Sequence, residues 1–527
     1  MTEGFSSVKV GGIGLQQVTF TPTTTVSNAS VQVVTQGVTG LDFSLDSTTC
    51  TGTITAGNSC TVNVIFTPLA PGLRRGAVEL SGSGGLVSTQ LISGVGQGPA
   101  LAFSPSTQTT APATGLSQPY GVAVDAAGDV FIGEPGANLV YKVTPGGVQT
   151  GVGTITGHPY GLAVDGAGDV YIAELNNNRV VKVTPAGVQT TVPATGLTQP
   201  IAVAVDGSGD VFISDRNNNR VVEITPSGVQ TTVPATGLNQ PYGIALDAAD
   251  DVFIADYNNN RVVEVTPGGV QTTVPTNGLT QPYGVTVDAA GDVFIASYSN
   301  GDVVEVTPGG VETTVPASGL SGPSGVAVDG AGDIFISDYN NNRVVEMVDS
   351  QPPSLAFANT NEGSISIDSP QSVTLQNIGN LALDTAGPGL VVNGPNFVEV
   401  AGTGTPADCD AIFAAGPLAP GADCNLSISF EPQAVGPLTS TAVITDNALN
   451  GSPATQTINL SGTGVTVIDY TLTVSDIGTG SGTVTDGSQI ACTETNGINS
   501  GSCSGSYSSG TGVTLTASPT GTSQFLG

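Results

Sequence analysis

Tyrosines recur at two kinds of position in this chain, and tyrosine combines a large rigid contact area with a hydroxyl that hydrogen-bonds. One group follows a proline directly before an apolar run: Tyr120, Tyr160, Tyr242 and Tyr283. The other group follows the second predicted strand of a repeat: Tyr257, Tyr298 and Tyr339, with Arg216 at the equivalent position of a fourth copy. These side chains suit the binding of sugar rings or peptides. The alternative is that each tyrosine only packs beside its proline and the next repeat.

Acidic residues and arginines recur at a constant spacing in the same part of the chain. Each arginine follows an acidic residue by five positions and ends an Asn-rich loop: Glu174 and Arg179, Asp215 and Arg220, Asp256 and Arg261, Asp338 and Arg343. A carboxylate and a guanidinium repeated in this way predict an ion pair that orders the loop. An arginine that contacts a ligand is the alternative.

The sequence assigns no catalytic residue, no metal site and no cofactor. The single histidine, His158, occupies the place of Gln118, Gln199, Gln240 and Gln281 in other repeats, which favours a structural role. Motifs such as GxSxG, the P-loop, CxxC and HExxH are absent from the sequence. Turns such as DAAGD (125–129) lack the ligand spacing of a calcium loop, and Asp and Gly favour tight turns in any case. A divalent cation remains the alternative reading of these turns.

A repeat of about 41 residues must position these side chains. It is marked by Asp125, Asp165, Asp206, Asp247, Asp288 and Asp329. In one copy, β-patterned runs at 243–246, 251–255, 261–265 and 270–274 are separated by turn residues. Four short strands in each of six repeats predict an all-β fold with a six-bladed β-propeller over residues 101–349. Because the last repeat lacks a fourth strand and TQTTAPATGL (107–116) matches that strand elsewhere, we expect residues 106–112 to complete the last blade.

The repeat text PYGLAVDGAGDVYIAELNNNRV (159–180) and its copies resemble the NHL-repeat family. The resemblance implies a propeller that serves as a binding platform or sensor domain and, less often, as a lyase or hydrolase. NHL-type amidating lyases rely on several histidines around zinc, which one histidine cannot supply. Virginiamycin-lyase-like propellers use a catalytic histidine, and the repeat position of His158 argues against that role. A gluconolactonase-like site needs only carboxylates and asparagine around a divalent ion, so that alternative stays open.

Two flanking segments match each other, with SCTVNVIFTP (59–68) and DCNLSISFEP (423–432) placing Cys, apolar residues and Pro at equal offsets. They predict β-sandwiches over residues 1–100 and 350–465, and they resemble bacterial Ig-like modules of the hydin and choice-of-anchor type. Residues 466–527 resemble a truncated β-repeat of bacterial surface proteins. The chain is therefore expected to be a slice of a longer exported polypeptide.

Six cysteines fall into three local pairs: Cys50 and Cys60, Cys409 and Cys424, Cys492 and Cys503. Local pairing predicts disulfides and an extracellular or cell-surface location. The 10 basic residues against 42 acidic ones leave a net charge of −32, which excludes nucleic acid as a partner and disfavours anionic lipid. Because apolar runs are short, direct membrane insertion is not expected.

These observations predict a non-enzymatic exported or cell-surface protein. The propeller face would bind a glycan, peptide or protein partner, and the sandwich modules would act as spacers. Two alternatives remain open. The chain could be a structural stalk without a ligand, or it could be a metal-dependent hydrolase or lyase that works in the propeller channel.

Overall fold

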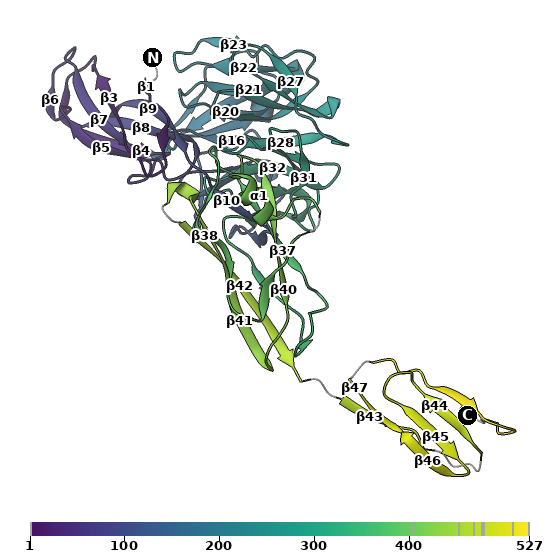
Figure 1. Cartoon of the computed structure of the whole chain (residues 1–527). Coiled ribbons are helices and arrows are strands. Elements are labelled where there is room, and N and C mark those ends of the chain that lie inside the picture. The colour runs from purple at the N-terminus through teal and green to yellow at the C-terminus, as the bar shows by residue number, and fades with distance from the viewer. Residues whose placement is uncertain are drawn as a thin grey trace.

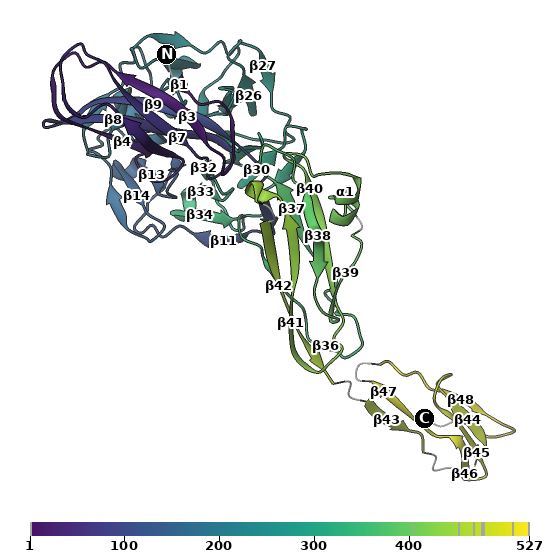
Figure 2. The ribbon, with the colours of Figure 1, turned by 60° about the vertical axis from the view of Figure 1, so that its left-hand side comes forward.

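The computed structural model describes residues 3–402, 404–451, 454–466, 469–475, 480–508 and 511–524. Strands dominate these ranges, and the α-helix α1 (Cys409–Ala415) is short. Figure 1 shows a first module against the propeller, a second module extending from it, and a small C-terminal module at the far end. The turned view in Figure 2 shows the same elongated arrangement. The fold class is all-β, as the sequence predicts.

Six four-stranded antiparallel sheets form the propeller. From the inner to the outer strand they are β12 (Val122–Val124), β13 (Val130–Glu134), β14 (Leu139–Val143) and β15 (Gln149–Gly151) in blade 1; β16 (Pro159–Val164), β17 (Val170–Glu174), β18 (Arg179–Val183) and β19 (Gln189–Thr191) in blade 2; β20 (Pro200–Val205), β21 (Val211–Asp215), β22 (Arg220–Ile224) and β23 (Gln230–Thr232) in blade 3; β24 (Pro241–Leu246), β25 (Val252–Asp256), β26 (Arg261–Val265) and β27 (Gln271–Thr273) in blade 4; β28 (Pro282–Val287), β29 (Val293–Ser297), β30 (Asp302–Val306) and β31 (Glu312–Thr314) in blade 5; and β32 (Pro323–Val328), β33 (Ile334–Asp338), β34 (Arg343–Val348) and β11 (Thr107–Thr110) in blade 6.

The second strand of each blade is buried at every residue, as in β25. A middle strand is covered on both faces because its sheet lies between two neighbouring blades, which explains its continuous apolar sequence. The packing is visible between blades 3 and 4, where Phe212 and Val221 share one cluster with Ile244 and Ile254. Burial of apolar side chains between blades therefore holds the propeller together.

Close contacts between inner strands join the blades into a ring. A Cβ added to Gly243 would lie 2.5 Å from the carbonyl oxygen of Tyr283 in the next blade, so glycine is needed there. The same contact joins blade 6 to blade 1, where a Cβ on Gly325 would lie 2.5 Å from the carbonyl oxygen of Tyr120. The outer strand β11 pairs antiparallel with β34, from Thr107 opposite Val348 to Thr110 opposite Val345. The last blade is thus completed by chain that precedes the first.

The first module consists of two sheets around a core that includes Phe43 and Phe66. Its disulfide joins Cys50 and Cys60. One sheet contains β1 (Glu3–Gly4), β9 (Gly85–Gln97), β8 (Gly72–Gly82), β4 (Val26–Thr35) and β6 (Gly52–Ile54), with β2 (Val8–Lys9) beside β9; the other contains β3 (Gly14–Phe20), β7 (Cys60–Phe66) and β5 (Phe43–Thr48).

The second module also has two sheets around one core, with a disulfide between Cys409 and Cys424. One sheet contains β10 (Leu101–Ser104), β37 (Gln371–Asn377), β40 (Asp423–Phe430) and β39 (Phe397–Glu399); the other contains β35 (Ser354–Ala356), β42 (Ala454–Val465), β41 (Gly436–Asp446) and β38 (Thr385–Val392), with β36 (Thr360–Asn361) beside β42. The strand β10 lies in the segment that the repeat pattern assigns to the propeller. It pairs instead with β37. The repeat pattern could not indicate this pairing, because β37 lies more than 250 residues later in the chain.

The C-terminal module has two small sheets and a disulfide between Cys492 and Cys503. Its strands are β43 (Asp469–Thr473) and β47 (Ser504–Ser508) in one sheet, and β46 (Ile498–Ser502), β45 (Ala491–Thr495), β44 (Gly482–Thr485) and β48 (Thr516–Pro519) in the other. All three predicted disulfides are therefore present. No helix in the described ranges is long and apolar enough to cross a membrane.

Candidate functional site: the tyrosine surface of the propeller

The predicted tyrosines come together on one face of the propeller. Tyr160, Tyr242 and Tyr283 are each the second residue of an inner strand, and Tyr120 occupies the equivalent position just before β12. Tyr257 and Tyr339 begin the short 3₁₀ turns that follow the second strands, as Arg216 does in blade 3. We call the seven tyrosines and Arg216 the tyrosine surface: Tyr120, Tyr160, Tyr242, Tyr257, Tyr283, Tyr298, Tyr339 and Arg216.

Ring contacts link all seven tyrosines. The rings of Tyr242 and Tyr257 stack with centroids 4.3 Å apart, and those of Tyr283 and Tyr298 stack at 4.4 Å. Tyr120 contacts Tyr160 edge-on at 4.4 Å, which continues the cluster into blade 2. Tyr339 closes it through Tyr120 and Tyr298. Aromatic pairs at such distances stabilise each other beyond their burial, so the seven rings form one rigid cluster.

Burial divides the tyrosines into two layers. Tyr120 and Tyr242 are 8% and 6% exposed and form the buried layer of the cluster. The other five are half-buried, so part of each side chain reaches solvent. Burial raises the pKa of Tyr242 to about 12, so its hydroxyl stays protonated at neutral pH. The Arg216 guanidinium lies 5.1 Å from the centre of the Tyr242 ring and adds a cationic group to an otherwise neutral surface.

Four ion pairs order the loops that carry this surface. Asp215 is fully buried and accepts hydrogen bonds from Arg220 Nε at 2.8 Å and from Asn218 Nδ2 at 2.7 Å. Asp256 with Arg261 and Asp338 with Arg343 repeat the contact at 2.8 and 2.7 Å, and Glu174 pairs with Arg179. The five-residue spacing therefore marks an ion pair that holds the loop, as predicted.

One acidic residue in this series lacks its partners, and the spacing rule did not single it out. Glu134 ends the second strand of blade 1, where the text EPGANL replaces ELNNNR of blade 2. Its side chain is buried, and the described residues offer no hydrogen-bond partner to its Oε1 atom. The sequence does contain a signal: blade 1 has an acid at the repeat position, but Ala137 and Leu139 stand where other repeats have Asn and Arg.

The central channel lies beneath the tyrosine surface. Directly below the rings is a small cavity of about 70 Å³, and a larger one of about 300 Å³ lies near the opposite face. Residues Pro71–Arg75 of the first module line the larger cavity together with the ends of the inner strands. The first module therefore covers the channel mouth opposite the tyrosine surface.

The first module approaches the propeller very closely. A Cβ added to Gly166 would lie 2.2 Å from the carbonyl oxygen of Gly76, so the two backbones touch. Val34 and Ala77 of the module pack against Ala167 of a propeller turn. These contacts leave the tyrosine side as the face of the channel that a partner can reach.

The aspartate turns carry structural hydrogen bonds. In blade 1, Asp125 Oδ1 accepts from the backbone N–H groups of Ala127 and Asp129 at 2.9 and 3.0 Å. Its other oxygen faces Lys142 at 3.6 Å. The same backbone contacts recur in the other blades, so the aspartates stabilise turns. The backbone of His158 has a φ of 54° and its N–H donates to Asn138 at 2.8 Å, so this position also belongs to a turn.

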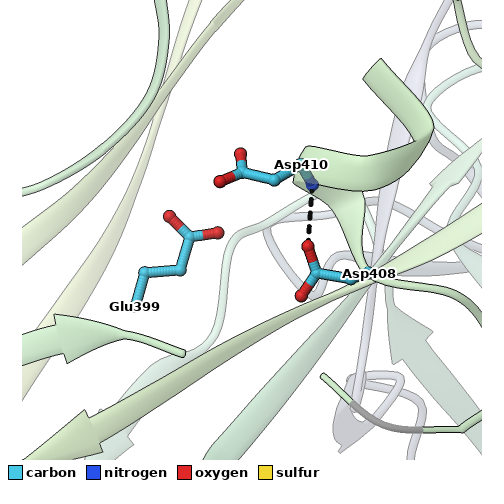
Figure 3. Close-up of side chains that lie close together, drawn as sticks. All are labelled: Glu399, Asp408 and Asp410. Carbon is cyan, nitrogen blue, oxygen red and sulfur yellow. Dashed lines mark hydrogen bonds between the residues drawn. The ribbon is translucent and has the colours of Figure 1, made fainter. Parts of the chain in front are cut away.

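A group of three carboxylates that no sequence pattern indicates lies in the second module (Figure 3). Glu399, Asp408 and Asp410 place one oxygen each within 4.8 Å of one another. Asp408 caps α1, accepting from the N–H of Asp410 at 3.1 Å, and its other oxygen accepts from the N–H of Gly402 at 2.7 Å. Burial and the two aspartates raise the pKa of Glu399 to about 7. Because helix capping explains Asp408, this group is not assigned as a metal site.

Comparison with known proteins bears on the propeller. Residues 101–347 match the model of the virginiamycin B lyase family, a β-propeller-type repeat family. No curated protein sequence matches the chain significantly. Virginiamycin B lyase from Staphylococcus aureus is 19% identical, with 47% of this chain and 88% of that chain covered and a TM-score of 0.37. A gluconolactonase from Xanthomonas campestris is 14% identical, with coverage of 48% and 94% and a TM-score of 0.42. Residues 101–347 thus carry the sequence signature of the virginiamycin B lyase family within a larger all-β chain.

Proposed function

We propose that this protein is a non-enzymatic, exported or cell-surface binding protein. Its tyrosine surface would hold a glycan, peptide or protein partner, and the flanking Ig-like modules would act as spacers. The observation that carries the proposal is the convergence of seven tyrosines and Arg216 at the channel mouth that the first module leaves uncovered. The three disulfides support an oxidising environment.

The rigidity of the tyrosine surface supports binding in a second way. Its rings already contact one another, and ion pairs hold the loops that carry them. A partner would therefore not have to order these side chains. The half-buried edges of Tyr257, Tyr298 and Tyr339 would supply apolar contact and hydroxyl groups together. Such surfaces bind sugars and peptides well because each ring loses little conformational freedom.

The test is a binding screen of the full chain against cell-wall glycans, polysaccharides and peptide libraries. A Tyr257→Ala/Tyr298→Ala/Tyr339→Ala variant runs beside it, and a Tyr470→Ala variant serves as control because Tyr470 is 60% exposed but lies in the C-terminal module. We expect at least one ligand class whose affinity falls about tenfold or more in the triple variant and is unchanged in the control. A screen without ligands, or equal binding by the folded triple variant, would favour a structural stalk.

A lyase or hydrolase is the second candidate, and the family match over residues 101–347 favours it. One solved relative is a catalytically inactive histidine-to-alanine variant of virginiamycin B lyase with quinupristin, so that enzyme depends on a histidine. The histidine available to this chain is His158. Turnover of a streptogramin B antibiotic or of a lactone, with a stoichiometric divalent ion in the purified protein, would establish this candidate. Activity lost on His158→Ala would locate it.

A further inference from the structure

Blade 1 retains a buried acid whose cationic partner has been lost. In blades 2, 3, 4 and 6 the acid at the end of the second strand is followed by an asparagine three residues later and an arginine five residues later. Blade 1 has Glu134 but carries Ala137 and Leu139 at those two places. Blade 5 has lost the acid as well, with Ser297 in its place. Blade 1 is therefore the copy in which an acid stands without its arginine.

The complete copies show how the loop holds a guanidinium. In blade 3, Asp215 Oδ1 accepts from the N–H of Thr198 at 2.6 Å, and Oδ2 accepts from Arg220 Nε at 2.8 Å. Arg220 Nη2 also donates to the carbonyl oxygen of Gly196 at 3.3 Å. A carboxylate and a carbonyl oxygen thus form a slot for one guanidinium. Arg261 and Arg343 fill the same slot with the same contacts.

The blade 1 slot has the carboxylate, but the described residues place no cation beside it. Glu134 is 1% exposed, and its Oε2 accepts from the N–H of Ser117 at 2.7 Å. Its Oε1 is buried and has no hydrogen-bond partner among the described residues. No described atom lies within 4 Å of the Cβ position of Gly115, whereas an arginine Nη2 lies 3.7 Å from that position of Gly196 and Gly237.

Glu174 in blade 2 is the matched comparison, because it is the same residue type with its partners present. It accepts from the N–H of Thr156 at 2.9 Å, from Asn177 at 3.1 Å and from Arg179. Burial raises the pKa of Glu174, but these hydrogen bonds outweigh burial and lower it overall. Burial raises the pKa of Glu134 to about 7, since only the Ser117 N–H opposes it. Glu134 thus lacks both the asparagine and the arginine that bond to Glu174.

We infer that the blade 1 slot binds the guanidinium of an arginine side chain supplied by a peptide or protein partner. The four complete copies show that this loop geometry accepts a guanidinium, and a planar guanidinium can reach a carboxylate and a carbonyl together. Leu139 stands where the arginine stands elsewhere, lies opposite Glu134 in the pairing of β13 with β14 and is 41% exposed, so its side chain can move with little loss of packing. The net charge of −32 attracts a basic partner.

The inference rests on the proposed function and deepens it. The slot opens on the same face as the tyrosine surface, because Glu134 ends the second strand of blade 1 and Tyr120 precedes its inner strand. The backbone N–H of Tyr120 donates to the carbonyl of Gly133 at 2.9 Å, which fixes the two positions beside each other. A partner lying across the tyrosines would therefore place one arginine in blade 1.

The experiment measures binding of acetyl-Gly-Arg-Gly-amide to the full chain by calorimetry at low ionic strength. The citrulline peptide, which keeps the shape and loses the charge, and free argininamide are measured beside it. Equal binding by argininamide would indicate a small guanidinium ligand, and tighter binding by the peptide would indicate a peptide partner. We expect the citrulline peptide to bind at least tenfold more weakly. We expect binding to tighten as the pH rises through about 7, since the ionised form of Glu134 is required.

Variants separate the slot from general electrostatic attraction. Glu134→Gln should weaken the arginine peptide at least tenfold. Glu312→Gln is the matched control: it removes the same charge from the propeller and restores the Gln that other repeats carry at that place, as at Gln271. Glu312→Gln should leave binding unchanged. Equal binding by folded Glu134→Gln, or no binding by the wild type, would overturn the inference.

Filling the slot from within the chain gives an independent readout. Ala137→Asn/Leu139→Arg restores the complete pattern, and we expect it to raise the melting temperature by several degrees and abolish peptide binding. In a Glu134→Gln background the same two changes should bring no such gain. If the wild-type protein fails to bind the arginine peptide but still binds a glycan or peptide at the tyrosines, this inference alone is rejected. If the wild type binds neither, the proposed function is rejected as well.

Discussion

Each buried acid in the ordered propeller loops has one arginine as its oppositely charged partner. Asp256 is fully buried, and Arg261 reaches it from a position that is about one-third exposed. Removing one member of such a pair leaves a charge in a poorly solvated place, which costs more than the intact pair contributes. The consequence is that the arginines of these loops matter for stability even though they lie at the surface.

Arg261→Ala should therefore destabilise the propeller by about 2 kcal/mol, less than for a fully buried pair because Arg261 is partly exposed. Chemical denaturation followed by circular dichroism measures the change. The double variant Asp256→Asn/Arg261→Met should recover most of the loss, because it leaves no unpaired charge. A single variant as stable as the wild type would mean that solvent already screens Asp256.

At this scale the sequence predicted much of the site. The five-residue spacing indicated the four ion pairs, and the repeat register indicated which tyrosines share a face. The difference between the buried Tyr120 and the half-buried Tyr257 was not predictable, because it depends on how six copies crowd around one axis. The isolation of Glu134 was also missed, since it follows from residues that blade 1 lacks.

Strands and turns follow the repeat closely. The runs expected at 243–246, 251–255, 261–265 and 270–274 are found as β24 (Pro241–Leu246), β25 (Val252–Asp256), β26 (Arg261–Val265) and β27 (Gln271–Thr273). Alternation and turn residues determine such strands locally, which explains the agreement. The pairing of β10 with β37 was not predictable, because a four-residue strand carries no information about a distant partner.

The pairing of β11 with β34 makes a prediction about closure of the propeller. Ala111 N–H donates to the carbonyl of Val344 at 3.0 Å, and antiparallel alternation then places the N–H of Thr109 opposite the carbonyl of Glu346. Thr109→Pro removes this donor from the last blade. We expect a loss of about 1–2 kcal/mol in propeller stability and faster proteolysis near residue 107.

Thr109→Ala is the control for this experiment. It removes the side-chain hydrogen bond to Glu346 but keeps the backbone donor. Calorimetry of both variants should therefore show a clearly lower melting temperature for the proline variant alone. If both variants melt like the wild type, the outer strand contributes little to closure.

At the scale of the whole molecule, the modules are joined by polar contacts as well as apolar ones. Gln376 of the second module donates to Asp292 at 3.3 Å and to Glu305, both in blade 5. Asp292 is fully buried, and the described residues give its Oδ1 no hydrogen-bond partner. In blades 1 and 2 a lysine stands in the place of Glu305 and pairs with the aspartates. Blade 5 has only carboxylates there, together with Asp423 of the second module.

This interface should open as the pH rises. Burial first, and then the neighbouring carboxylates of Asp288 and Glu305, raise the pKa of Asp292 well above its ordinary range. A carboxyl whose pKa is raised in the docked state binds its proton more tightly there, so docking is favoured at low pH and lost as the pH rises through the raised pKa. We expect the radius of gyration, measured by small-angle X-ray scattering, to increase between about pH 5 and pH 9.

Asp292→Asn removes the titrating group while keeping the hydrogen bond from Gln376 possible. This variant should stay docked across the same pH range. Glu264→Gln, at the place of Glu305 in blade 4, is the control and should behave as the wild type. An unchanged radius for the wild type across the range would show that apolar contacts such as Ile378 against Gly332 suffice to hold the module.

The repeat period, the strands within it, the acid–arginine pairs and the three disulfides could all be read from the chain, because each depends on residues that are close in sequence or recur at a fixed interval. The covering of one channel mouth by the first module and the docking of the second module on blade 5 were decided by the tertiary structure. These features join surfaces from distant segments, and the contacts that join them occur once. A contact made once leaves no period or alternation in the sequence from which it could be recognised.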